Sequence, residues 1–373
     1  YSQSAMISFG ILDSIMLFAL RDINDDITNQ CLLAILSTVT KNPLKRNNLN
    51  FNASLLMSLP KPPASPPEYG LRAKRIRSVR SSPSLSSYGG FNLNNENGSE
   101  QEFEVDVKNF ENIIGSLFEL LHIKSSDMSN FAPINLIIDI FIELTNLLPI
   151  LIKRLYENGL FQFALDSLSI HELAKSSLNL IGNLPTYSSN SFIQNMIENG
   201  LFEKLIFLIQ NIEFTSDAYW VLSNFLQAAP QFIVPLISRD LIKMTVEVGI
   251  QSSFHVKREI AYFLSNLIII SNNNDIIRAL SNEETIELIS EMLNSGAKDL
   301  TTRCIVAFQK IFILSVQDNS SQLNPGVILE IFDSCDIIKQ LEDISQQTDP
   351  SNSALIAAAS KLIFDVQSYS SEQ

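Results

Sequence analysis

Two sets of side chains in this sequence combine a carboxylate, an aromatic ring and an asparagine amide at positions i, i+3 and i+7. The first set is Asp217, Trp220 and Asn224, and the second, 42 residues later, is Glu259, Tyr262 and Asn266. This spacing places the three side chains of a set on one face of a helix. A ring attracts a Lys or Arg head group, a carboxylate pairs with it, and an asparagine amide can hold a peptide backbone. Each set is therefore suited to binding a basic peptide.

Catalytic chemistry is not indicated. The sequence has no glycine-rich phosphate loop, nucleophile elbow or HExxH motif. Its histidines, His122, His171 and His255, have no partners at metal-ligand spacing. We therefore expect a protein that is not an enzyme and that uses no cofactor or metal. A structural alternative stays open for the two sets, because a tryptophan is often a packing residue and the asparagines can bond to neighbouring helix ends.

An internal repeat indicates which elements position these sets. Glu157-Asn158-Gly159-Leu160-Phe161 recurs 41 residues later, beginning at Glu198, and a motif ending in Asn183, Asn224 and Asn266 recurs at spacings of 41 and 42. A period near 40 in helical sequence is typical of armadillo or HEAT units. Each Asn-Gly pair supplies a left-handed turn between two short helices. The sequence predicts an all-α, right-handed superhelical solenoid of armadillo repeats, whose equivalent helices line one groove.

The 373 residues exceed what a single core uses, and we divide them into four parts. Residues 1–44 form one or more armadillo units, residues 105–332 form further repeats, and residues 333–373 form a C-terminal capping unit. Residues 45–104 are rich in Asn, Pro and Ser. Such a composition buries too little apolar surface to order itself, so we predict a disordered insertion there.

Charge is distributed unevenly. The net charge is −14, but residues 45–90 carry eight Lys or Arg and one acid, a net +7, which leaves −21 for the remainder. A body this acidic repels nucleic acid and attracts basic partners. No apolar run is long enough for a membrane span.

Several motifs, in order, carry a resemblance to a known family. Asp217–Asn224 resembles the Trp-x-x-x-Asn helix of importin-alpha, the armadillo adaptor that binds nuclear localisation signals. Ser177–Asn183, Lys257–Asn266 and Cys335–Leu341 are similar to further units of that family, and Cys31–Pro43 to an earlier one. The similarity covers about 310 residues, all but the insertion. It departs from the family pattern where Asn179 and Tyr262 replace other residues.

The resemblance implies a nuclear import adaptor present in cytoplasm and nucleus. Its cargo would be proteins with basic nuclear localisation signals. It would meet importin-beta through a segment missing from this chain, which begins in the middle of the array, and an export receptor of the importin-beta superfamily through its C-terminal repeats. The implied signal-binding residues are Asn183, Thr186, Asp217, Trp220, Asn224, Glu259, Tyr262 and Asn266.

The insertion contains a basic tetrapeptide of the nuclear-localisation type. Lys74, Arg75 and Arg77 fit that pattern, and we hypothesise that they compete with cargo as an autoinhibitory segment. The alternative is a solvated basic loop, or a site regulated by phosphorylation at Ser81, Ser82 or Ser84. For the whole chain, two other classes stay open: an armadillo scaffold of the beta-catenin or plakophilin kind, and a HEAT-type regulatory subunit. Because such scaffolds bind acidic tails in basic grooves, the acidic body argues against the first.

Overall fold

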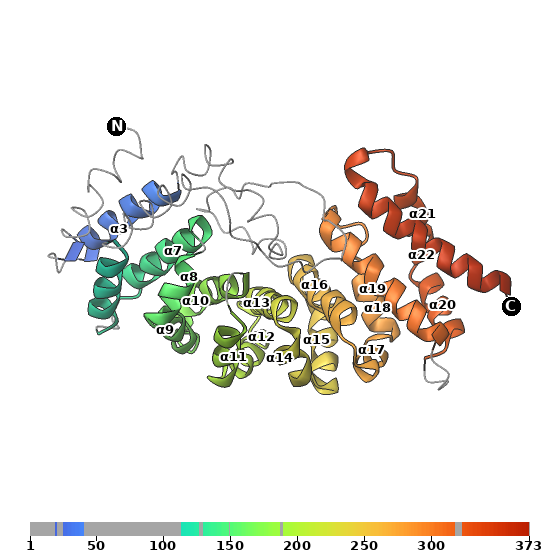
Figure 1. Ribbon diagram of the computed structural model, residues 1–373, viewed down its shortest axis with the longest axis horizontal. Helices are drawn as coiled ribbons and strands as arrows, with labels where there is room; N and C mark the ends of the chain where they lie inside the picture. The colour runs from blue at the N-terminus through green and yellow to red at the C-terminus, as the bar shows by residue number, and fades with distance from the viewer. Residues whose placement is uncertain are drawn as a thin grey trace, which may run out of the picture. The chain divides into compact units, whose positions relative to one another are not determined.

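The computed structural model describes residues 19–20, 25–40, 113–126, 130–148, 150–186, 189–317 and 323–372. Every regular element within these ranges is helical (Figure 1). None of the helices in these ranges is both long and apolar enough to span a bilayer. The chain divides after Ser188 into two compact units, each considered by itself. The basic residues Lys74, Arg75 and Arg77 lie outside the described residues.

The first unit stacks the long helices of successive repeats. Helix α3 packs against α7, and α7 packs against α10, while the shorter helices α8 and α9 join α7 to α10. Asn135 Nδ2 on α7 donates to the backbone oxygen of Glu172 on α10 at 3.0 Å. Besides the helical residues 113–125, the elements are α3 (Asp25–Thr40), α7 (Ala132–Leu147), α8 (Leu151–Glu157), α9 (Leu160–Ser167), α10 (His171–Asn183) and η2 (Leu184–Thr186).

The second unit repeats a group in which shorter elements precede a longer helix. The long helices α13, α16, α19 and α22 follow one another in Figure 1, each packed against the next. The elements are α11 (Asn190–Glu198), α12 (Leu201–Ile209), α13 (Thr215–Ala228), α14 (Pro230–Ile233), η3 (Val234–Leu236), α15 (Arg239–Gln251), α16 (Phe254–Ile270), α17 (Asn274–Leu280), α18 (Glu283–Ser290), α19 (Lys298–Gln317), α20 (Pro325–Ser334), α21 (Ile337–Ser345), η4 (Pro350–Asn352) and α22 (Ser353–Glu372).

Left-handed residues separate the short helices, as the Asn-Gly pairs predict. Gly159 between α8 and α9 has φ 82°, and Gly200 between α11 and α12 has φ 87°. Asp336 occupies the corresponding place between α20 and α21 with φ 53°. A glycine reaches this region without the steric cost of a Cβ. The same turn is therefore used at three short-helix junctions of the described chain.

Hydrogen bonds between long helices confirm the repeat period. Ser216 Oγ on α13 lies 3.1 Å from His255 Nε2 on α16, 39 positions later. Ser265 Oγ on α16 donates to Cys304 Sγ on α19 at 3.7 Å, again 39 positions later. Along α16 and α19 such bonds run from the pair Tyr262 and Asp299 to the pair Ile269 and Lys310, with offsets of 37 to 41 positions, so these two helices lie side by side and parallel. The predicted all-α solenoid is confirmed, while the four part boundaries and the superhelical hand stay predictions.

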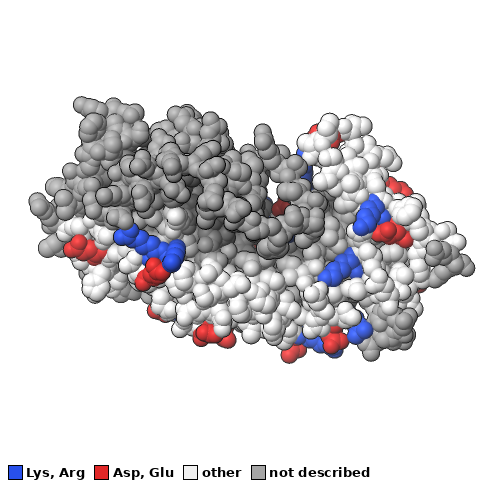
Figure 2. Space-filling view, viewed as in Figure 1, with Lys and Arg blue, Asp and Glu red and all other residues white. Residues whose placement is uncertain are grey.

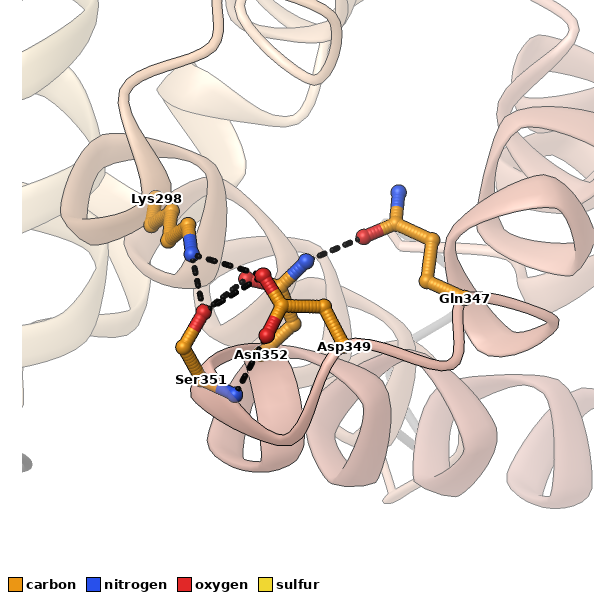
Figure 3. Close-up of polar contacts among 5 residues, drawn as sticks. All are labelled: Lys298, Gln347, Asp349, Ser351 and Asn352. Carbon is orange, nitrogen blue, oxygen red and sulfur yellow. Dashed lines mark hydrogen bonds and ion pairs between the residues drawn. The ribbon is translucent and has the colours of Figure 1, made fainter.

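A polar cluster joins the start of α19 to η4 (Figure 3). Lys298 Nζ donates to Ser351 Oγ at 2.6 Å and lies 3.7 Å from Asp349 Oδ2. Asp349 Oδ1 accepts the backbone N–H of Ser351 at 2.9 Å, which caps the short helix. The Ser351 hydroxyl donates to Asp349 Oδ2 at 2.7 Å, and this hydrogen bond, together with that from the Ser351 N–H, holds the pKa of Asp349 below its ordinary value. Because the cluster is solvent-exposed, its ion pair adds little to the free energy of unfolding. Its structural effect is to connect the start of α19 to the turn before α22.

Candidate functional site

Helix α13 carries the first predicted set. It begins at Thr215, whose hydroxyl donates to the backbone oxygens of Ile209 at 2.9 Å and Asn211 at 2.8 Å. Asp217, Trp220 and Asn224 fall on one face of this helix and are 1%, 1% and 3% exposed. The predicted set is thus buried in the folded chain, as are all residues from 215 to 226.

Helix α16 carries the second set, and it is buried as well. Glu259, Tyr262 and Asn266 are each 1% exposed or less. Glu259 Oε1 accepts from Nη2 of the neighbouring Arg258 at 2.9 Å. A buried carboxylate needs such a partner, because an isolated charge in the interior is costly. The negative charge of Glu259 is therefore at least partly satisfied within α16 itself.

The ring and amide of the second set hold a guanidinium that belongs to the same chain. Arg303 on α19 places its guanidinium carbon 5.1 Å from the centre of the Tyr262 ring. Its Nε donates to the Tyr262 hydroxyl at 3.1 Å, and its Nη1 donates to Asn266 Oδ1 at 2.8 Å. Asp299, one turn earlier on α19, accepts the Tyr262 hydroxyl and lies 3.6 Å from Arg303 Nε. A ring–guanidinium contact of the predicted kind thus occurs within the chain. It differs from the prediction in two ways: the carboxylate beside the guanidinium is Asp299 and not Glu259, and Asn266 accepts from the guanidinium and not from a peptide backbone.

Arg303 also reaches the helix two repeats earlier. With the Gln227 amide turned so that its oxygen faces the guanidinium, this oxygen accepts from Nη2 at 3.0 Å and Nη1 at 3.1 Å. Gln227 is on α13, Asn266 on α16 and Arg303 on α19. One guanidinium thus connects three consecutive long helices. The sequence interpretation missed Arg303, although it lies 41 positions after Tyr262, at the ring position of the next repeat.

Two buried donors of the predicted sets have no acceptor within the described part of the chain. They are Trp220 Nε1 on α13 and Asn266 Nδ2 on α16. A buried N–H without a partner costs about 1 to 3 kcal/mol. Native proteins rarely keep such groups without a reason. The contacts of the described chain therefore leave these two donors unsatisfied.

The remaining predicted residues lie in the first unit. Asn183 is the last residue of α10 and is half-buried, and Thr186 ends η2. The structure therefore brings together the sets on α13 and α16, with Arg303, inside one compact unit, and it describes Asn183 and Thr186 in the other.

Charged side chains on the visible face are scattered. Figure 2 shows acidic and basic residues spread over the described surface of that face, with no single patch of one sign. Among the described residues, no group of three or more His, Cys, Asp or Glu is arranged to hold a metal ion.

Comparison with known proteins identifies the fold. No family model matches the chain, and no curated protein matches it. An engineered protein, Northeast Structural Genomics Consortium target OR497, superposes with TM-score 0.55 at 14% identity, covering 98% of this chain and 80% of that one. A second engineered protein, target OR366, gives TM-score 0.53 at 17% identity, covering 68% and 98%.

The repeated group, in which shorter helices precede a long one that packs on the next long helix, decides the architecture. This chain is an armadillo-type solenoid. A designed armadillo repeat protein solved with the peptide (KR)4 gives TM-score 0.43 at 17% identity, over 57% of this chain and 85% of that one. At these identities the likeness concerns the fold alone, so the function must be argued from the side chains.

Proposed function

We propose that this chain is an armadillo adaptor that binds Lys/Arg-rich peptides along its long helices. The observation that carries the proposal is the Arg303 contact, in which a tyrosine ring and an asparagine amide bind a guanidinium. The same residue types stand one repeat earlier as Trp220 and Asn224. There, the position equivalent to Arg303 is Tyr262, so the next helix supplies a ring and no cation. That slot suits a cation from outside the chain.

The slot between Trp220 and Tyr262 has the groups that a basic side chain needs. Trp220 and Tyr262 stand at equivalent positions of successive long helices, so an aliphatic stem inserted between these helices would meet both rings. Asp217 and Glu259 stand one turn earlier on each helix, and Glu259 shares its charge with Arg258. A cation–π contact contributes about 0.5 to 2 kcal/mol and a charged hydrogen bond about 1.5 to 3 kcal/mol. Because these side chains are buried in the folded chain, a peptide can bind only if they become exposed. The free energy needed to expose them reduces the free energy of binding. We therefore expect affinity no tighter than about micromolar.

The buried donors account for recognition of the peptide backbone. Trp220 Nε1 and Asn266 Nδ2 have no acceptor in the described chain, and an extended peptide presents a carbonyl at every residue. Backbone recognition of this kind is independent of peptide sequence, whereas the rings and carboxylates select basic side chains. The combination favours an extended basic segment over a folded basic surface.

The finer proposal is nuclear import. It is supported by the ordered resemblance to importin-alpha, which implies nuclear localisation signals as ligands and both cytoplasm and nucleus as locations. The expected partners are importin-beta and, at residues 333–373, an export receptor of the importin-beta superfamily. A scaffold without an import role is the alternative. Co-purification of the export receptor that persists after deletion of 333–373 would reject its proposed site.

A titration tests the peptide proposal. A labelled peptide of alternating Lys and Arg should bind at low salt and weaken as salt rises, whereas the same peptide with Glu at the basic positions should not bind. Asp217→Asn should weaken binding several-fold and reduce the salt dependence. Asp240→Asn is the matched control, because Asp217 and Asp240 each lie in the first turn of a helix, α13 and α15. Equal effects of the two variants would contradict a specific cation slot.

A further inference from the structure

The guanidinium of Arg303 occupies a built site whose walls come from other helices. The Tyr262 ring lies 5.1 Å beneath it, and Asn266 Oδ1 accepts from Nη1 at 2.8 Å. The Gln227 oxygen, in the orientation described above, accepts from Nη2 at 3.0 Å. Tyr262 and Asn266 are fully buried, whereas the side chain of Arg303 is 23% exposed. The groups that receive the guanidinium thus belong to α13 and α16, while the guanidinium comes from α19 on a side chain that keeps some solvent exposure.

We propose that Arg303 is an internal ligand: the Tyr262 ring and the Asn266 amide of α16, with the Gln227 amide of α13, form a guanidinium-binding site, and Arg303 closes it to external cations. The guanidinium site stands on the contacts just described. The consequence for peptides rests on the proposed function. Because Arg303 fills the site beside Tyr262, the slot beside Trp220 is the last one on this side that an external basic side chain can enter. Arg303 then limits how many basic side chains of a bound peptide can enter slots between the long helices.

The geometry selects a guanidinium over an ammonium. A planar guanidinium stacks on a ring while its edge donates to acceptors in several directions. Here the edge donors reach Tyr262, Asn266 and Gln227 together. An ammonium presents three donors around one point and cannot face the ring and reach all three acceptors. Removal of the Arg303 side chain should therefore leave a vacancy that small guanidinium ions fill and small ammonium ions do not.

Chemical rescue tests this directly. Arg303→Ala should lower the Tm by about 3 to 8 °C. Ethylguanidinium at about 10 mM should restore about 2 to 4 °C of that loss, a concentration too low for denaturation. Ethylammonium at equal ionic strength should restore nothing. Equal effects of the two ions, or no effect of either, would overturn the internal-ligand proposal.

Arg278→Ala is the matched control. The Arg278 side chain is 25% exposed, a fraction similar to that of Arg303, and its Nη1 lies 3.2 Å from Asp275 Oδ1 on the same helix. Ethylguanidinium should give that variant no more protection than it gives the unmodified protein. If Arg303→Ala does not fold, Arg303→Lys supplies the second measurement. Its Tm should fall well below that of the unmodified protein, and an unchanged Tm would overturn the proposal, because an ammonium would then serve equally.

Peptide binding separates this proposal from the proposed function. In Arg303→Ala, the alternating Lys/Arg peptide should bind about 3- to 10-fold more tightly, because one more slot is open. If ethylguanidinium rescues the variant while neither protein binds the peptide, the guanidinium site is upheld and the proposed function fails. If the peptide binds both proteins equally and no rescue occurs, the proposed function is upheld and the internal-ligand proposal fails.

Discussion

Tyr219 on α13 donates its phenolic hydrogen to Thr245 Oγ1 on α15 at 3.0 Å, inside the core of the second unit. Thr245 in turn donates to the backbone oxygen of Leu241 at 2.8 Å, so both hydroxyls are satisfied. Burial raises the pKa of Tyr219, and burial likewise raises the pKa of Tyr262 beside Arg303. Two neutral phenols are therefore built into consecutive repeats of the same unit.

This arrangement predicts a loss of stability in alkali. Because both phenols keep their protons in the folded state, their contribution is complete below the ordinary tyrosine pKa of about 10. This stabilising contribution is lost as the pH rises from about 10 toward the raised pKa values of the two tyrosines in the folded protein. The free energy of unfolding should fall by about 1.4 kcal/mol per pH unit for each tyrosine above that point. Denaturant titrations at several alkaline pH values measure this slope.

Tyr219→Phe provides the control for that slope. The variant should lose about 0.5 to 1.5 kcal/mol at neutral pH, the contribution of one hydrogen bond. Thr245 keeps its bond to Leu241, so no buried hydroxyl loses its only partner. Above pH about 10, the free energy of unfolding of this variant should fall less steeply with pH, by about 1.4 kcal/mol per pH unit less than in the unmodified protein. An unchanged slope would mean that Tyr219 ionises freely in the folded protein.

A second prediction concerns the left-handed turn at Asp336. This residue has φ 53°, where Gly159 and Gly200 stand at the equivalent junctions. A side chain in that region costs roughly 1 kcal/mol, which Asp tolerates better than most residues. Asp336→Gly should therefore stabilise the protein by about 0.5 kcal/mol, after the larger entropy of the unfolded glycine is subtracted. Chemical denaturation measures the change.

Gly200→Ala is the opposite substitution at the matching turn. It should destabilise by about 1 kcal/mol, because alanine at φ 87° is strained although only the end of the Glu203 side chain lies near the added Cβ. Stabilisation by Gly200→Ala, or a loss on Asp336→Gly, would show that these turns are not limited by backbone strain.

The fold follows from sequence periodicity because each repeat uses the same local devices. The pairs Asn158-Gly159 and Asn199-Gly200 carry the left-handed turns, and the spacing of Asn224 and Asn266 gives the period of the long helices. Both features can be recognised from residues that are close to one another in the sequence or that recur at a fixed spacing. The solenoid then results from stacking of similar units.

The occupancy of the site could not be predicted in the same way. The ring-and-amide pattern identifies Tyr262 and Asn266, but Arg303 breaks the pattern at its own repeat and so carries no ring signal. Its role depends on side chains that meet across three helices, including Gln227 from 76 positions earlier. The burial of Asp217 and Glu259 could not be predicted from the sequence pattern either, because acidic residues are mostly exposed and only the three-dimensional structure shows an exception.

The autoinhibitory hypothesis gives a third prediction. Lys74, Arg75 and Arg77 lie outside the described residues, so their role stays a prediction. A tethered basic segment has an effective concentration on the order of millimolar when its linker spans the distance. Replacing all three by Ala should therefore tighten binding of the Lys/Arg peptide several-fold at low salt. Titrations at two salt concentrations measure this, and equal affinities for the two proteins would reject autoinhibition.

The last prediction separates binding from packing at Trp220. The side chain is 1% exposed, so Trp220→Ala should lower the free energy of unfolding by about 3 to 5 kcal/mol through the cavity that it leaves. If Trp220 also forms a cation slot, affinity for the Lys/Arg peptide per folded molecule should fall by about 0.5 to 2 kcal/mol. Titration calorimetry well below the Tm of the variant, with the folded fraction measured in parallel, gives both quantities.

Phe225→Ala supplies the comparison, because Phe225 is also fully buried on α13 but belongs to neither predicted set. It should lose a similar amount of stability and leave the affinity per folded molecule unchanged. Equal losses of affinity in the two variants would mean that α13 acts only by holding the unit together. A loss confined to Trp220→Ala would separate the indole's contact with the peptide from its packing, because the cavity penalty is common to both variants while the cation–π term is not.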